Sequence, residues 1–487
     1  MNQSIRELQP QELWNHFADL NAVPRPSKKE EQVIEFMMDF GKQLGLETHK
    51  DPIGNVIIKK PATAGMEDRK TVVLQSHLDM VHQKNNDTDF DFDTQGIEMY
   101  IDGDWVKAKG TTLGADNGIG VATIMAVLAS NTMQHPAIEA LFTIDEETGM
   151  TGAMELDGSL ISGDILLNLD TEEDDEIDIG CAGGVDITAE AEYDEEDTPE
   201  GSLAYKITVK GLKGGHSGMD IHKGLGNANK IMNRLLYNGY EDFGLQISEI
   251  QGGSLRNAIP RESVANIIIA KLYQEAFEYD FGLLINEIKE ELSTVEPDLT
   301  IEVESLENLP AKVMPPMAQF YVVRGLYAAH NGVYKMSADF DDLVETSNNI
   351  AKVEVGNGKI TIQCLTRSSV ETSKYDLANA LRAAFELMGC EVTLSGAYPG
   401  WTPNPNSGIL KVAEEIYENQ NNEKAKVVAC HAGLECGILG SHFPEMDMIS
   451  FGPTIRGAHS PDERVSVNSV QKYWKFVTEV LNNIPKQ

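Results

Sequence analysis

The chain contains 487 residues with 39 basic and 77 acidic side chains, which gives a formal net charge of −38 at pH 7. A field of this sign repels nucleic acid and anionic lipid, so we expect neither as a partner. The length favours two or three domains with a large buried core.

The cysteines and the apolar pattern bear on the compartment. Five cysteines, an odd number, are scattered without a Cys-x-x-Cys pair, which is typical of a reducing compartment. The amino-terminal residues lack a long apolar core, and no run of about 18 apolar residues occurs. The sequence therefore predicts a cytoplasmic protein with neither a signal peptide nor a membrane span.

The first 184 residues alternate helices and strands, as in an α/β domain. A helix over 5–20 is followed by a second helix, for which Ser27 and Glu30 form a predicted capping box. The remaining predicted elements are strands over 55–59 and 71–76, a buried helix over 119–128, and strands that end near 147 and 170.

The strand over 71–76 runs into a polar end, where His77 and Asp79 lie two residues apart. On an extended strand this spacing presents an imidazole and a carboxylate on one face. Open α/β sheets bind ligands in the crevice beyond the carboxyl ends of their strands, so the pair suits a functional site. Taken alone, the pair equally fits a histidine and an aspartate that are hydrogen-bonded at a surface turn.

Acidic and histidine side chains recur in similar contexts along the chain. Asp116 lies in a glycine-rich turn before an apolar run, and Glu146 and Glu147 follow another apolar segment. Because neighbouring residues on a strand point to opposite sides, the two glutamates are predicted to have different roles. Asp170 ends a short apolar strand, and His459 follows an apolar segment near the carboxyl end.

Together these segments offer two histidines and at least three carboxylates, a mixed nitrogen and oxygen set without a thiolate. Such a set suits divalent zinc and, less well, manganese or cobalt. One aspartate can bridge two ions, which leaves each ion one histidine, one further carboxylate and a shared water. Three protein ligands and an open position are typical of catalytic rather than structural zinc.

The pattern changes after Gly184, where strands and helices mix as in an α+β insertion. A glycine- and proline-rich segment over 396–407 marks the end of the insertion, and the α/β pattern then resumes. The predicted catalytic domain is therefore discontinuous, with residues 1–184 and 398–487 on either side of an inserted domain over 185–397. Within the insertion we predict strands over 185–193, 204–210, 265–270, 352–354 and 360–365, and helices near 224–238, 273–292, 314–330 and 372–388.

Several motifs, taken together and in order, resemble the co-catalytic zinc peptidase family that includes carboxypeptidase G, peptidase T and the dipeptidases. These motifs are His77-x-Asp79, Gly-Ala-Asp116-Asn-Gly, Glu146-Glu147-Thr-Gly, Asp170 and Gly-Ala-His459-Ser. The resemblance covers nearly the whole chain. Three segments resemble the aminoacyl-histidine dipeptidase subfamily in particular, which cleaves Xaa-His dipeptides such as carnosine. These segments are Leu-Gly-Ala-Asp-Asn-Gly-Ile-Gly at 113–120, Gly-Cys-Ala-Gly-Gly at 180–184 and His-Ala-Gly-Leu-Glu-Cys-Gly at 431–437.

The resemblance implies a centre of two Zn²⁺ ions per chain, for which Co²⁺ or Mn²⁺ could substitute. Glu146 would act as general base towards the bridging water, whose pKa zinc lowers to about 7. Asp79 would fix the tautomer of His77. The implied ligands are His77 and Asp170 for one ion, Glu147 and His459 for the other, and Asp116 as the bridge.

The inserted domain resembles the lid of the same family. A lid histidine that stabilises the tetrahedral intermediate maps to His216, and Asn257 and Arg367 resemble residues that hold the carbonyl and carboxylate of the substrate. Glu435 is a candidate for binding the free α-amine of a short peptide. Because the insertion of about 210 residues is roughly twice the size of one small α+β lid, we predict a doubled, ferredoxin-like unit in which His216 acts within its own chain.

Other chemistries fit the sequence less well. Ser217 lacks the glycine spacing of a nucleophile elbow, and nothing marks Cys430 or Cys436 as an activated thiolate. The sequence therefore predicts metal-dependent hydrolysis of unblocked dipeptides by a protein that could form a homodimer. The alternatives are a tripeptidase or N-deacylase of the same family, or a non-catalytic binding protein on the same fold.

Overall fold

The computed structural model of the protein describes residues 2–340 and 342–487. The described chain forms two compact units. The first unit combines the residues up to Gly180 with Trp401–Ala429 and Leu434–Gln487, and the second combines Cys181–Gly400 with Cys430–Gly433. The division of the chain at residues 184 and 397 into a catalytic domain and a lid stays a prediction.

The first unit is built on a mixed sheet. In order across this sheet, the described strands are β1 (Glu47–Lys50), β2 (Val56–Lys60), β6 (Ile138–Thr143), β3 (Val72–His77), β7 (Ile165–Asn168), β23 (Asp447–Ser450), β8 (Glu176–Cys181) and β22 (Lys426–Cys430). The central strands β6, β3, β7 and β23 run parallel, and antiparallel pairs flank them. Every residue of β3, β6 and β7 is buried, so both faces of the sheet are covered.

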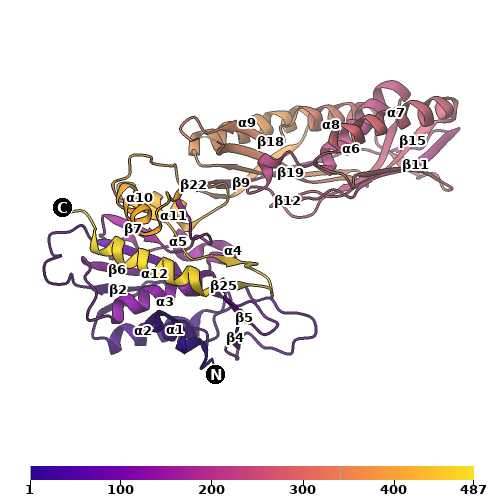
Figure 1. Ribbon diagram of the computed structural model, residues 1–487. Helices are drawn as coiled ribbons and strands as arrows, with labels where there is room; N and C mark the ends of the chain where they lie inside the picture. The colour runs from indigo at the N-terminus through magenta and orange to yellow at the C-terminus, as the bar shows by residue number, and fades with distance from the viewer. Residues whose placement is uncertain (1, 341) are drawn as a thin grey trace. The chain divides into compact units, whose positions relative to one another are not determined.

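Helices surround this sheet, and Figure 1 shows α3 and α12 beside it. The predicted helix over 5–20 is interrupted, because Pro10, which has no N–H to donate within a helix, immediately precedes the first residue of α1. The predicted capping box is wrong, because the Ser27 hydroxyl donates to Asp79 and does not cap α2. The helices are α1 (Gln11–Leu20), α2 (Glu31–Gln43), α3 (Ala115–Ala129), α4 (Glu146–Gly149), α5 (Thr151–Met154), α10 (Gly408–Asn421), α11 (Glu435–His442) and α12 (Val467–Asn482).

The second unit contains a larger antiparallel sheet, and helices α6 to α9 lie along one side of that sheet in Figure 1. Its main strands are β9 (Gly183–Glu192), β11 (Ser202–Lys210), β13 (Gln246–Gly252), β15 (Ser263–Ala270), β16 (Thr300–Leu306), β19 (Val344–Gly356), β20 (Lys359–Ser368) and β21 (Glu391–Tyr398). Its helices are α6 (Ala228–Phe243), α7 (Gln274–Leu292), α8 (Pro316–Ala328) and α9 (Glu371–Leu387).

A β-α-β-β-α-β unit occurs twice in this sheet. One repeat follows the chain order β11, α6, β13, β15, α7, β16 and the sheet order β16-β11-β15-β13. The other follows the chain order β9, α8, β19, β20, α9, β21 and the sheet order β21-β9-β20-β19. Because the two repeats share one connection pattern, the predicted fold class, with its doubled ferredoxin-like insertion, is confirmed. The first repeat is itself inserted between β9 and α8 of the second.

No helix among residues 2–340 and 342–487 is long and apolar enough to cross a membrane.

Candidate dinuclear metal centre

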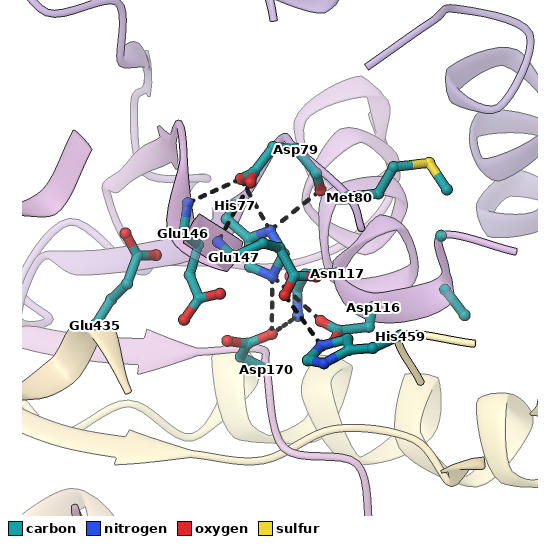
Figure 2. A network of polar contacts seen from close by, with 12 residues as sticks. His77, Asp79, Met80, Asp116, Asn117, Glu146, Glu147, Asp170, Glu435 and His459 are labelled. Atoms are coloured by element: carbon teal, nitrogen blue, oxygen red, sulfur yellow. Dashed lines mark hydrogen bonds and ion pairs between the residues drawn. The ribbon is translucent and has the colours of Figure 1, made fainter. Parts of the chain in front are cut away.

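The carboxyl ends of the parallel strands in the first unit bring most of the candidate ligands together (Figure 2). His77 is the last residue of β3, and Asp170 follows β7. Glu146 and Glu147 follow β6, and His459 lies in the loop beyond β23. Neighbouring parallel strands end at the same edge of a sheet, which is where open α/β sheets bind ligands.

The two glutamates do not lie on a strand as predicted from the sequence. β6 ends at Thr143, and Asp145 adopts a left-handed φ of 56° that turns the chain into α4, of which Glu146 is the first residue. Successive residues on a helix also point in different directions. The two glutamates therefore still point in different directions, although they lie on a helix and not on a strand.

Asp116 reaches the same place from the glycine-rich turn at the start of α3. Gly114 has a φ of 69°, and a Cβ atom there would lie 2.5 Å from a guanidinium nitrogen of Arg25. Only glycine meets both conditions without strain. The peptide bond between Asp116 and Asn117 is cis. The Asn117 amide donates to Asp170, so this turn also contacts a second candidate ligand.

Two groups of candidate ligands share Asp116. One group is His77, Asp116 and Asp170, and the other is Asp116, Glu147 and His459. Asp116 Oδ1 lies 3.2 Å from His77 Nε2, whereas Asp116 Oδ2 lies 3.2 Å from His459 Nε2. One carboxylate therefore directs one oxygen to each group.

The distances within both groups fit a bound metal ion. Asp170 Oδ1 lies 3.5 Å from His77 Nε2, and Glu147 Oε2 lies 3.0 Å from His459 Nε2. Around a tetrahedral zinc ion with ligand bonds of about 2.0 Å, ligand atoms lie about 3.3 Å apart. The second oxygen of Glu147 is buried without a hydrogen-bond partner among the described residues, so it is also available to a cation.

The protonation of the two histidines reflects the excess of carboxylates. Burial alone would lower the pKa of His77, but Asp170, Asp116 and Asp79 together raise that pKa well above its usual value. Hydrogen bonds to Asp116 and Glu147 raise the pKa of His459 to about 11. Protons on these imidazoles balance the negative charge, so uptake of a metal cation should release them.

Asp79 lies directly behind His77 and is fully buried. Its Oδ1 is 3.3 Å from His77 Nδ1 and accepts the backbone N–H of Glu146 at 3.0 Å. Its Oδ2 accepts the Ser27 hydroxyl at 2.8 Å and the Glu147 N–H at 3.3 Å. One carboxylate thus contacts the candidate ligand His77 and the backbone N–H groups of both glutamates. A carboxylate beside the second ring nitrogen of a metal-binding histidine typically fixes the orientation of that histidine.

Glu146 and Glu435 supply two further carboxylates in the first unit. Burial raises the pKa of Glu146 well above its usual value, and its carboxylate lies close enough to His77 and Glu147 to form a further candidate ligand group with them. Burial also raises the pKa of Glu435 to about 7. Glu435 Oε2 accepts the Gln75 amide at 2.6 Å and the Thr143 hydroxyl at 2.7 Å, whereas Oε1 is buried without a partner in the described chain. Sequence reasoning missed Gln75, although an amide within an otherwise apolar strand was a signal.

The second unit gathers three of the candidate residues and one that was missed. His216 Nδ1 accepts the backbone N–H groups of Gly218 and Met219, and its Nε2 lies 3.4 Å from Nη2 of Arg367. Burial and the nearby Arg367 lower the pKa of His216 to about 4. Asn257 is exposed, and its backbone carbonyl accepts the Ser217 N–H at 2.8 Å. His431, which was not singled out, is buried, and its pKa is lowered to about 3 by burial and then by Arg367.

The sheet and its edge define an α/β protein with a candidate dinuclear metal centre. The chain belongs to peptidase family M20/M25/M40, whose family model matches residues 73–483.

Individual relatives are similar over almost the whole length. The cytosol non-specific dipeptidase of Escherichia coli strain K12 is 45% identical over 481 residues, which cover 99% of each chain. The crystal structure of aminoacylhistidine dipeptidase from Vibrio alginolyticus matches with a TM-score of 0.94 and 44% identity, over 99% of this chain and 98% of that one. A tripeptidase from Staphylococcus aureus shares the fold, with a TM-score of 0.57 and 16% identity over 98% of this chain and 99% of that one.

Proposed function

We propose that this protein is a dinuclear metallopeptidase that hydrolyses dipeptides with a free amino terminus. The observation that carries the proposal is the pair of ligand groups that share the two oxygens of Asp116. Family membership and the two full-length relatives named as dipeptidases support the same activity. The name of the Escherichia coli relative also supports a cytoplasmic location.

The residues of the centre fit two divalent ions, and zinc is the first choice because the donors are imidazoles and carboxylates. When bound there, the ions would supply a Lewis acid for the scissile carbonyl and would acidify a water molecule. The distances between ligand atoms and the unpartnered oxygen of Glu147 support this fit. The holding residues are His77 and Asp170 on one side, Glu147 and His459 on the other, and Asp116 between them.

Glu146 is the general base of the proposed reaction. Its carboxylate lies beside the candidate ligands His77 and Glu147, and burial raises its pKa, which favours a group that can both accept and return a proton. Its backbone N–H is held by Asp79, which also contacts His77. Glu146 would take a proton from the attacking water and deliver that proton to the leaving amine, while Asp79 keeps His77 in one orientation.

Recognition of the two ends of a dipeptide rests on other residues. Glu435 offers a buried carboxylate oxygen that lacks a partner within the described chain, which suits a substrate ammonium group. In the second unit, Nδ1 of His216 is occupied by two backbone N–H groups, so Nε2 is the ring atom proposed to donate to a developing oxyanion. Arg367 and Asn257 complete the proposed set, for the substrate carboxylate and carbonyl respectively.

A panel of matched peptides tests this specificity. The panel contains carnosine, other Xaa-His dipeptides, dipeptides without histidine, one tripeptide, and the N-acetylated form of a good dipeptide. We expect hydrolysis of unblocked dipeptides and strong loss of kcat/KM on acetylation, because acetylation removes the ammonium group that Glu435 would bind. Faster cleavage of the tripeptide or of the acetylated dipeptide would instead assign a tripeptidase or an N-deacylase.

A further inference from the structure

Glu463 makes an unusual set of contacts in the first unit. Its side chain is 2% exposed. Oε2 accepts the backbone N–H groups of Leu113 at 2.7 Å and Gly114 at 2.9 Å. Oε1 accepts the N–H groups of Ala115 at 2.7 Å and Asp116 at 3.2 Å. One carboxylate therefore binds four consecutive N–H groups, the last of which belongs to the candidate bridging ligand.

These contacts join two loops that are far apart in sequence. Glu463 follows His459 by four residues, in the connection between β24 (Ile455–Arg456) and β25 (Arg464–Ser466). The His459 side chain is 57% exposed, and its Nε2 pairs with the carboxylates of Asp116 and Glu147. The bonds of Glu463 thus fix the His459 loop against the Asp116 turn.

The Asp116 turn is also held by Arg25. This buried guanidinium donates to the Gly114 carbonyl at 2.6 Å, and to the carbonyls of Leu78 and Asp79 at 3.0 and 3.1 Å. Arg25 therefore ties the turn to the end of β3, where His77 lies. Glu463 ties the same turn to His459. Each of the two residues connects Asp116 with the histidine of a different ligand group.

We propose that Glu463 is a positioning residue that sets the placement of His459 relative to Asp116, and so controls metal affinity at the group formed by Asp116, Glu147 and His459. This inference rests on the dinuclear centre proposed above. Each Glu463 oxygen faces two N–H donors, so an amide in its place would direct an NH₂ group at two of them. Changes behind a metal ligand typically weaken metal binding about 10–100-fold.

The matched control is Glu139, another buried carboxylate of the first unit. Glu139 accepts the backbone N–H groups of Ser162 at 2.7 Å and Gly163 at 2.9 Å. It lies near the start of β6, at the end of the strand opposite to the candidate ligands. Glu139→Gln therefore removes a similar carboxylate without touching either ligand loop.

The experiment is a titration of metal-stripped wild type, Glu463→Gln and Glu139→Gln with Co²⁺, followed by visible absorption and equilibrium dialysis. We expect wild type and Glu139→Gln to bind two ions alike. Glu463→Gln should bind one ion normally and the other at least about tenfold more weakly, with an altered spectrum. Glu463→Asp keeps the charge, so its affinity for the weaker ion should lie between those of wild type and Glu463→Gln. This variant also provides the test if Glu463→Gln does not fold.

Three results would count against these ideas in different ways. Binding of both ions by Glu463→Gln with wild-type affinity and spectrum would overturn the positioning role. An equal loss in Glu139→Gln would overturn it too, because the effect would then be general to buried carboxylates. Failure of the wild type to bind cobalt would overturn the proposed centre itself, and the positioning role with it.

Discussion

Replacing Glu146 by glutamine should separate proton transfer from metal binding. The amide keeps the shape of the side chain but cannot accept a proton. General acid–base catalysis is typically worth 10²–10⁴-fold, which corresponds to about 3–5 kcal/mol of transition-state stabilisation. We expect kcat to fall by that factor, while KM changes little and two metal ions remain bound, because the two ligand groups that share Asp116 do not include Glu146.

The pH profile gives this prediction a second readout. Burial raises the pKa of Glu146, and a base is inactive below its pKa. In wild type, kcat/KM should therefore rise with pH up to that pKa and then level off, and Glu146→Gln should lack this limb. Glu147→Gln is the matched control and should lose a metal ion. If Glu146→Gln loses the ion and Glu147→Gln only slows turnover, the two roles are reversed.

The remaining predictions concern the shared ligand, the substrate residues and a buried acid. Asp116→Ala should lose both ions in metal analysis after dialysis, and two ions retained would exclude a shared ligand. Glu435→Gln should raise KM for free dipeptides about tenfold or more, since a hydrogen bond to a charged group is worth about 1.5–3 kcal/mol; an unchanged KM would refute the amine contact. If the protein forms dimers, mixing His216→Ala with Glu146→Gln subunits should restore no activity, and recovered activity would show that His216 acts across subunits. Burial raises the pKa of Asp178 from 3.8 to about 7, so the folded protein binds this proton more tightly than the unfolded chain does. The free energy of unfolding should therefore fall as pH rises between these two values. Between pH 5 and pH 8, the free energy of unfolding of Asp178→Asn, measured with urea, should therefore rise relative to that of wild type by up to about 3 kcal/mol. A difference in unfolding free energy that does not change with pH would refute the raised pKa.

Local patterns in the sequence were enough to find the candidate ligands. His77 and Asp170 end apolar strands, and Asp116 lies in a turn whose glycines are required by close packing. The topology of parallel strands then brings such residues to one edge. The doubled insertion was also predictable, because its length and its repeated strand and helix mixture both indicate duplication.

Contacts between distant segments were not predictable from one sequence. Glu463 reads as one acid among many in a chain with 77 of them, and only the folded chain brings it to four N–H groups 347 or more residues away. Ser27 has the spacing of a helix cap, but the buried Asp79 offers its hydroxyl a charged acceptor. Glu146 and Glu147 were predicted on a strand because the turn at Asp145 has no glycine to mark it.

The most direct test of the dinuclear mechanism is a zinc titration of the metal-stripped protein in which bound zinc and dipeptide hydrolysis are measured on the same sample. The proposed centre predicts negligible hydrolysis without metal and a plateau of activity at two zinc ions per chain, because Asp116 directs one oxygen to each ligand group. Full hydrolysis by the metal-stripped protein, or a preparation that binds no zinc, would contradict it.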